Sequence, residues 1–206
     1  MKREMRRGSA IGALLGLVAV TASASVSPIP FEPQSRLWVE GTSTVRSYTC
    51  EAGDLLGSVH PKPGVTTFAL ADLERAVEKV ELSVPVAELD CRNGTMNGHM
   101  RKALLADQHP TIRYTLGSYD VQLEEGDEAT VVLAGRLEMA GQERPITMEG
   151  TATPEPDGAL RVRGVTQILM TDWGIKPPSL MMGTMKVHAP VNVHFDVVLK
   201  PLVSAR

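Results

Sequence analysis

Apolar and polar residues alternate along most of this chain, which is the pattern of β-strands that bury one face. The clearest case runs from Ala129 to Met139, where Val131, Leu133 and Leu137 share one face and Arg136 lies on the other. The same alternation predicts further strands in residues 37–45, 54–60, 80–86, 111–119, 144–153, 160–171 and 191–199. A chain dominated by this two-residue period is expected to fold as an all-β protein.

Turn sequences separate the predicted strands. The segments Ala140–Glu143 and Pro156–Gly158 have the composition of tight hairpin turns, which favour an antiparallel arrangement. One segment, Met96 to Ala106, instead spaces its apolar residues as a helix does, and a second helical turn is expected around residues 72–76. We therefore predict one antiparallel barrel or sandwich with one short helix.

The first residues have the features of an export signal. Basic residues at positions 2–7 precede an apolar run from Ala10 to Val20, and Ala22–Ala24 supplies a small-residue cleavage site. The apolar run is too short for a stable transmembrane helix, although an uncleaved anchor is the alternative. The predicted organisation is a signal peptide at 1–24, an N-terminal extension at 25–35, the domain at 36–201 and a tail at 202–206. This predicts a periplasmic or secreted location.

Removal of the signal peptide would leave a mildly acidic chain. It takes away four basic residues and one acidic residue, so the formal charge moves from −3 to about −6. No block of basic residues remains, which argues against nucleic acid as a partner. Transient contact with a membrane or a redox protein, and a homodimer, are compatible with the sequence.

The two cysteines, Cys50 and Cys91, both lie in the predicted exported part. In an oxidising compartment such a pair predicts a disulfide, and two separate thiols are the alternative. Closing this loop would stabilise the fold by about 4 kcal/mol on the chain-entropy model.

No enzyme motif stands out in the sequence. It has no nucleophile elbow, no phosphate-binding glycine loop and no HExxH segment, so we predict no catalytic residue, no metal site and no cofactor. One weaker alternative is a Cu(I)-handling protein, because thioether and imidazole ligands suit that ion, although methionine more commonly fills irregular apolar space. The candidate copper ligands are Met96, His99, Met100, Met181, Met182, Met185 and His188.

Four stretches of the chain together resemble one known family. The first is LWVEGTSTVRSYTC, from Leu37 to Cys50. The second runs from Val80 to Leu116 and contains HPTIRY after the predicted helix. The third is AGRLEMAGQERPITMEG, from Ala134 to Gly150, and the last is TDWGIKPPSLMMGTMKVHAP, from Thr171 to Pro190, with the following VNVHFDVVL. In this order they are similar to the opening strand, helix region, hairpin and closing segment of YceI-like domains.

The resemblance implies an eight-stranded antiparallel, lipocalin-like barrel with a long lumen. It also implies a long-chain apolar ligand such as a polyisoprenoid, a quinone or a fatty-acid-like molecule. Other members carry a His-Ser pair in the first strand and an Arg-Asp pair before the helix region, whereas this chain has Thr42-Ser43 and, approximately, Asn97 to His99. The chemistry that would hold a ligand headgroup therefore does not transfer.

The residues themselves are compatible with a hollow interior. An eight-stranded barrel is either just filled by side chains or just wide enough for one slim ligand, and this chain has only three Phe, two Trp and three Tyr. Glycines 41, 135, 150 and 164 recur within strands, which indicates either a close approach by another group or bends at barrel corners. The alternative is a filled barrel that serves as a non-enzymatic structural or interaction module.

The segment 171–190 is expected to lie at one mouth of the barrel as an apolar lid, with one cis bond conceivable at Pro177-Pro178. It would either cover a ligand or merely plug the lumen. The candidate lumen or lid residues are Trp38, Phe68, Met100, Leu137, Met139, Met148, Met170, Trp173, Ile175, Leu180, Met181, Met182 and Phe195.

Overall fold

The computed structural model of the 206-residue chain describes residues 27–53, 55–180 and 184–200. The longer strands are β2 (Arg36–Ser43), β3 (Ser47–Ala52), β4 (Leu56–Pro61), β5 (Val77–Pro85), β7 (Thr111–Leu123), β8 (Ala129–Met139), β9 (Gln142–Pro154), β10 (Leu160–Leu169) and β12 (Met185–Leu199). Three two-residue strands are β1 (Ile29–Pro30), β6 (Leu89–Asp90) and β11 (Ser179–Leu180). The helical elements are η1 (Leu70–Asp72), α1 (Leu73–Ala76), η2 (Val86–Glu88), α2 (Gly94–Ala103) and η3 (Met170–Trp173).

All strands belong to one antiparallel arrangement in the order β1-β4-β5-β7-β8-β9-β10-β12-β2-β3-β6, with β11 paired to β12 beside this path. The all-β, antiparallel class and the short helix are confirmed. The number of eight strands is wrong, because eleven lie along the path. The eight segments with clear alternation all form strands, whereas β1 and β6 are too short to alternate and β3 has little apolar content.

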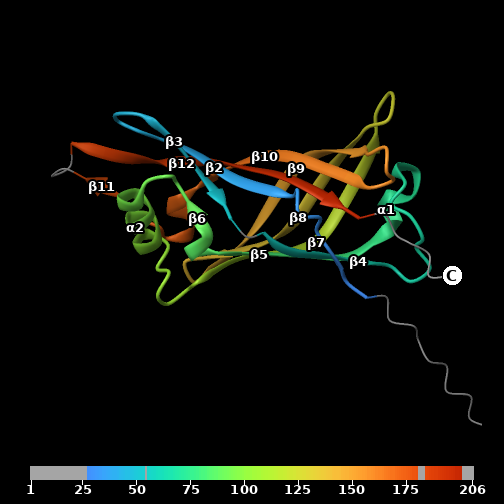
Figure 1. Cartoon of the computed structure of the whole chain (residues 1–206), viewed down its shortest axis with the longest axis horizontal. Helices are drawn as coiled ribbons and strands as arrows, with labels where there is room; N and C mark the ends of the chain where they lie inside the picture. The colour runs from blue at the N-terminus through green and yellow to red at the C-terminus, as the bar shows by residue number, and fades with distance from the viewer. Residues whose placement is uncertain (1–26, 54, 181–183, 201–206) are drawn as a thin grey trace, which may run out of the picture.

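The sheet curls into a half-barrel and does not close edge to edge (Figure 1). Within the described ranges, its terminal strands β1 and β6 have no pairing with each other. At one end, which α1 marks in Figure 1, an N-terminal strap of residues 29–32 bridges the gap. Phe31 donates its N–H to the carbonyl of Gly57 at 3.0 Å and forms a bridge with Leu199, while Glu32 donates to Val198 at 2.9 Å. The segment expected as an extension thus joins β4 to β12.

At the other end, α2 lies across the gap (Figure 1). The Asn93 side chain accepts the N–H of Met96 at 3.0 Å and caps the helix, as the sequence Asn-Gly before a helical pattern favours. Asn97 then donates to the carboxylate of Asp90 at 2.7 Å, and Arg101 donates to a backbone carbonyl of η2 at 2.9 Å. These bonds attach the helix to the segment that precedes it.

A break in register on β7 decides which of its residues face inward. The pairing with β8 shifts between Leu116 and Ser118, so Gly117 forms a bulge. The bulge changes the phase of the alternation, and Tyr119 and Val121 join Tyr114 and Leu116 among the residues packed in the core. Without the bulge, serine and aspartate side chains would face the interior.

The predicted hairpins are confirmed. Ala140 and Gly141 both have positive φ angles, 49° and 76°, which is the geometry of a two-residue turn between β8 and β9. Gly158, with φ of 83°, turns the chain between β9 and β10. Among the residues that the structure describes, no helix is long and apolar enough to cross a membrane.

Candidate functional site: a two-chamber lumen

Two adjoining cavities lie inside the curl of the sheet. The larger, the wide chamber, has a volume of about 600 Å³, and the smaller, the narrow chamber, has about 170 Å³. Side chains that line both cavities form a neck between them: Leu37, Leu82, Leu137, Ile168 and Val193. Because these side chains line both cavities, the two chambers adjoin each other at the neck, and together they are called the lumen.

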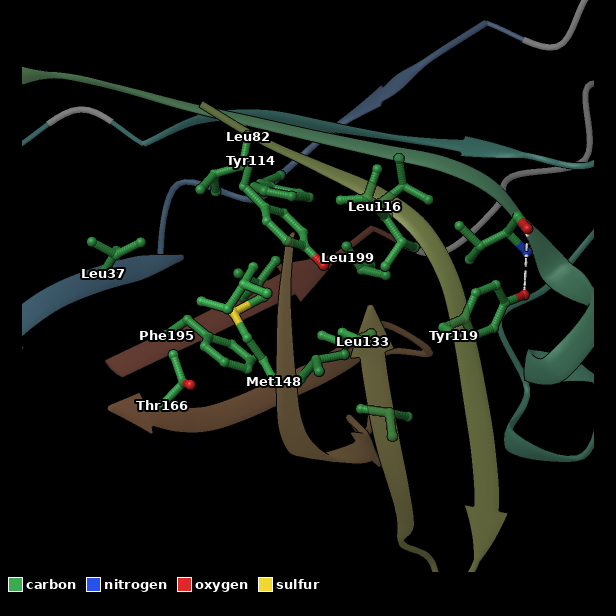
Figure 2. Close-up of a pocket in the computed structure, with 18 of the residues that line it drawn as sticks. Leu37, Leu82, Tyr114, Leu116, Tyr119, Leu133, Met148, Thr166, Phe195 and Leu199 are labelled. Atoms are coloured by element: carbon green, nitrogen blue, oxygen red, sulfur yellow. Dashed lines mark hydrogen bonds between the residues drawn. The ribbon is translucent and has the colours of Figure 1, made fainter. Parts of the chain in front are cut away.

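The narrow chamber lies at the end that the strap closes. Its lining is aliphatic or aromatic apart from the hydroxyl of Thr166 and two tyrosine hydroxyls, and Figure 2 shows Met148, Phe195 and Leu199 around it. Phe31 of the strap also lines it. An apolar cavity of roughly 150 Å³ stays dry and holds about one benzene-sized group, so this chamber suits a short length of hydrocarbon chain.

The wide chamber lies under α2. Its size falls within the roughly 300–1,000 Å³ of small-molecule sites. The helix contributes Met96, His99, Met100 and Ala103, and Leu104 follows on the same face. This is the spacing that predicted a helix, so one face of α2 forms a wall of the chamber, and its flexible thioether side chains can adjust to different shapes.

Polar residues occur in the wide chamber where it meets solvent. Ser43, Arg46 and Tyr48 come from the β2–β3 hairpin, and Asn93 and Thr95 come from the start of α2. Arg46, Asn93 and Thr95 are exposed, so this polar edge is the mouth of the lumen. Burial raises the pKa of the Tyr48 phenol, which therefore remains protonated in neutral solution. The lumen is thus apolar at depth and polar at its mouth.

Aromatic rings lie flat against the wall of the lumen over glycines of neighbouring strands. The close pairs are Tyr48 on Gly41, Tyr114 on Gly135 and Phe195 on Gly164. A Cβ at any of these glycines would overlap the ring that covers it. The rings occupy space that side chains would otherwise fill, so they protrude less into the lumen. Of the two sequence interpretations, close approach therefore holds for these glycines, and the approaching groups are the protein's own rings.

Two tyrosines on β7 line the narrow chamber and differ in their hydrogen bonds. The Tyr119 hydroxyl donates to the carbonyl of Leu73 at 2.8 Å and accepts the N–H of Val77 at 3.0 Å, so it ties β7 to α1 and β5. The Tyr114 hydroxyl is buried and has no hydrogen-bond partner in the described part of the chain. Burial raises the pKa of Tyr114 to about 12.

The predicted disulfide between Cys50 and Cys91 is present, and both cysteines line the wide chamber. Cys50 belongs to β3, and Cys91 lies between β6 and α2. The pairing of β3 with β6 involves only two residue pairs, so the disulfide is the covalent attachment of the α2 region to the sheet edge. The Met100 sulfur lies 3.7 Å from the Cys91 sulfur.

A family model described as YceI-like domain matches residues 35–199. The chain belongs to the YceI-like family. This confirms the resemblance inferred from the four sequence stretches. No curated protein sequence matches the chain.

Solved structures with the same fold include three bacterial proteins. The crystal structure of Burkholderia cenocepacia BcnA has a TM-score of 0.64 at 14% identity, covering 81% of this chain and 97% of that one. A polyisoprenoid binding domain from Saccharophagus degradans, implicated in plant cell wall breakdown, has a TM-score of 0.63 at 14% identity, covering 84% of this chain and 97% of that one. The Campylobacter jejuni YCEI protein has a TM-score of 0.52 at 13% identity, covering 73% of this chain and 84% of that one. At such identities the likeness shows a common fold.

In this YceI-like domain, seven of the residues predicted from sequence line the lumen. Met100, Met139, Met170 and Ile175 line the wide chamber. Met148 and Phe195 line the narrow chamber, and Leu137 belongs to the neck. Their contact with a ligand stays a prediction. Met181 and Met182 lie outside the described residues, as does the predicted signal peptide.

The other candidates lie elsewhere. Trp38 is on the outer face of β2, stacked on His194 with ring centroids 4.9 Å apart, which corrects its assignment to the lumen. Its neighbours Leu37 and Val39 line the cavities, so the alternation of the strand turns Trp38 outward. Phe68 is buried in the core near α1 but does not line either chamber.

Residues 171–180 and 184–190 of the closing segment pack against the sheet. Trp173 is buried, and its indole N–H donates to the carbonyl of Leu137 at 3.0 Å. It supports the neck from behind and does not line a chamber. Leu180 belongs to β11, which pairs with the start of β12, and both Pro177 and Pro178 follow trans peptide bonds. The described part of the segment also lines the wide chamber, through Ile175, Pro178, Met185 and Val187.

The candidate copper ligands do not all gather at one place. Met96, His99, Met100 and Met185 line the wide chamber. The Nδ1 of His188 instead forms a hydrogen bond with the Thr42 hydroxyl at 2.9 Å. Among the described residues, no group of three or more His, Cys, Asp or Glu side chains is arranged to hold a metal ion.

Several lining residues were missed from the sequence. Phe31 lay in the presumed extension, and Tyr114 and Tyr119 lay in a predicted strand without being chosen. Alternation with Ile112 and Leu116 was a sufficient signal for Tyr114. Tyr119 carried no such signal, because the bulge at Gly117 reverses the phase of the strand.

Proposed function

We propose that this protein is an exported binding protein that sequesters or carries a long-chain apolar molecule in its lumen. The molecule belongs to the polyisoprenoid, quinone or fatty-acid-like class, and the location is the periplasm or the exterior of the cell. The observation that carries the proposal is the pair of adjoining, mostly apolar chambers inside the curl of the sheet, which share the side chains of the neck. The Saccharophagus degradans domain of the same fold, named for polyisoprenoid binding, supports this ligand class.

The physical basis is the preference of an apolar cavity for hydrocarbon over water. Water in the narrow chamber would lose hydrogen bonds, because nearly all the lining side chains are apolar. A hydrocarbon loses none. Burying about 300 Å² of apolar ligand surface would contribute some 7 kcal/mol before the costs of association.

The shape of the lumen sets the orientation of the ligand. Phe31 of the strap lines the narrow chamber, and the polar edge at Arg46, Asn93 and Thr95 belongs to the wide one. We expect the slender apolar end of the ligand to lie in the narrow chamber and the bulkier or more polar end to face the mouth. The alternative of a filled, purely structural barrel does not account for the open volume.

The proposal is tested by extracting protein purified from its native host with organic solvent and identifying the extract by mass spectrometry. The matched variants are Val193→Trp, which blocks the neck, and Val165→Trp on the adjoining strand, where Val165 is 52% exposed. We expect one class of long-chain molecule in near-stoichiometric amount from the unchanged protein and from Val165→Trp, and much less from Val193→Trp. Equal recovery from both variants, or no long-chain molecule from any of the three, contradicts the proposal.

A further inference from the structure

One polar group in the lumen has no structural task. The Tyr114 side chain is 7% exposed, and its hydroxyl has no hydrogen-bond partner among the described residues. Figure 2 shows this hydroxyl pointing into the pocket. Two further buried side-chain atoms lack a hydrogen bond among the described residues, the Nε2 atoms of His60 and His194. Each of them lies 3.3 Å from a carboxylate oxygen. The Tyr114 hydroxyl has no such neighbour.

The position of Tyr114 along the lumen is defined by strand register. It pairs with Leu82 on β5 and with Leu137 on β8. Both partners belong to the neck, while Tyr114 itself lines the narrow chamber. The Cζ carbon of its ring lies over Gly135, which pairs with Leu116 of the narrow chamber, so the hydroxyl lies inside the narrow chamber, beyond the neck.

The orientation of the ring is restricted by its wall. A Cβ at Gly135 would lie 2.6 Å from one ring carbon of Tyr114 and 2.5 Å from the carbonyl oxygen of Thr115. The ring thus lies against bare backbone, where only glycine leaves room for it. A ring held in this way presents its hydroxyl in a fixed direction, which a binding group requires.

Water cannot satisfy this hydroxyl well. A buried water needs two to four polar partners, but the narrow chamber offers, besides Tyr114, only Thr166 and Tyr119 among its side chains. The Tyr119 hydroxyl already has its own partners, and Thr166 lies on the other side of the pocket (Figure 2). A buried hydroxyl without a partner is costly, so an acceptor supplied by the ligand accounts for it.

The chamber also selects the charge of that acceptor. Among the described residues, no basic side chain lines the narrow chamber, so a carboxylate or phosphate there would be buried without a counter-ion from this part of the chain. The phenol, with its pKa of about 12, remains a neutral donor. A neutral oxygen is therefore favoured over an anionic one.

We propose that Tyr114 is a ligand-recognition residue that donates a hydrogen bond to a neutral oxygen of the ligand, a carbonyl or hydroxyl, inside the narrow chamber. The ligand would then have an apolar tail in the narrow chamber, this oxygen beside Tyr114, and the remainder in the wide chamber. This inference rests on the proposed function and narrows it to amphiphiles that carry a neutral oxygen next to the chain.

The test uses hexadecane and the isomeric hexadecanones, which share one size and one polar group and differ in where the carbonyl lies. Binding is measured by displacement of N-phenylnaphthylamine from the unchanged protein and from Tyr114→Phe. We expect one isomer to bind the unchanged protein about three- to tenfold more tightly than the others, as for one net hydrogen bond. Tyr114→Phe should bind all isomers alike and hexadecane as before, without loss of thermal stability.

Three outcomes separate the two proposals. Equal affinity for all isomers in the unchanged protein overturns the role of Tyr114 but leaves the proposed function in place. The same isomer preference in both proteins also overturns it, since the hydroxyl then plays no part. Failure of hexadecane and every ketone to bind the unchanged protein contradicts the proposed function itself.

Discussion

The wide and narrow chambers are walled in large part by the same strands, yet they differ in size and in the chemistry of their lining. The narrow chamber lies where the strands are long, with the bulge at Gly117 in β7, and where the strap completes the wall with Phe31. The wide chamber lies where β3 and β6 pair over two residues and α2 must cover the gap. The long strands thus make a small apolar pocket, whereas a helix held at the sheet edge makes a larger, adaptable one with polar side chains at its edge.

The largest expected difference between the two chambers comes from the disulfide that attaches the α2 region to the sheet edge. Replacing both Cys50 and Cys91 by serine should lower the free energy of unfolding by about 2–4 kcal/mol, since the pair closes a loop of 41 residues in sequence. The loss should be local first, because only the wide chamber depends on the disulfide. Hydrogen exchange should rise in α2 before β7 and β8, and exchange that rises equally in both regions would show that the chambers are not independent.

The next largest expected difference is in the stability change on replacing a glycine by alanine, between a glycine under an aromatic ring in the sheet and a glycine on α2. Gly164→Ala places a Cβ against the Phe195 ring and the backbone oxygen of Glu149, and overpacking of this kind costs about 1–3 kcal/mol. Gly98→Ala on α2 is the matched control, because its Cβ would meet no atom within 4 Å, and there alanine should stabilise by about 0.5–1 kcal/mol. Chemical denaturation of both variants measures the difference, and a destabilised Gly98→Ala or a neutral Gly164→Ala would contradict the account.

The same methionine truncation in the two chambers sharpens the comparison further. Met148→Ala removes packing from the closed narrow chamber and should destabilise by about 1–2 kcal/mol, below the roughly 2–5 kcal/mol of a fully buried site because Met148 is half-buried. Met100→Ala, which faces the open wide chamber, should cost less than about 1 kcal/mol. Thermal unfolding of the ligand-free variants measures both. Equal losses would mean that the wide chamber is as tightly packed as the narrow one.

The smallest expected effect is a pH dependence at the start of α2. A hydrogen bond from the Asn97 side chain, and a second from the Arg92 N–H, lower the pKa of Asp90 below its usual value of 3.8. A carboxyl group whose pKa is lowered by folding stabilises the folded state. This stabilisation is complete at pH values above the ordinary pKa, and it is lost as the pH falls through the lowered pKa. The NMR shift of the Asn97 side-chain amide should therefore titrate with a midpoint below 3.8. A midpoint at or above that value, or an unchanged titration in Asp90→Asn, would contradict the assignment.

The sequence predicts the common framework of this molecule well. The eight alternating segments, the two hairpins, the helix and the disulfide are all present, because each is encoded by local spacing or by residue type. Trp38 shows the limit of reasoning from residue type, since its own strand alternation places it outside while its hydrophobicity suggested the lumen. Here the pattern was the better guide.

The parts that escaped prediction depend on contacts between distant segments. Phe31 completes the narrow chamber only because Leu199, near the other end of the chain, lies beside it. The ring of Tyr114 is held by Gly135 on the next strand, and Tyr119 faces inward only because of the bulge at Gly117. None of these relations leaves a local signature, so the division of the lumen into two chambers could not be read from the sequence.

The central claim is that one hydrocarbon chain passes through the neck and ends in the narrow chamber. The most direct test is a crystal structure with 1-bromohexadecane, which has no oxygen that could pair with Tyr114, using anomalous scattering to locate the bromine. The account predicts a bromine peak in the narrow chamber, among Met148, Phe195 and Leu199, with the rest of the chain extending past the neck toward α2. A bromine in the wide chamber or at the mouth, with an empty narrow chamber, would contradict it.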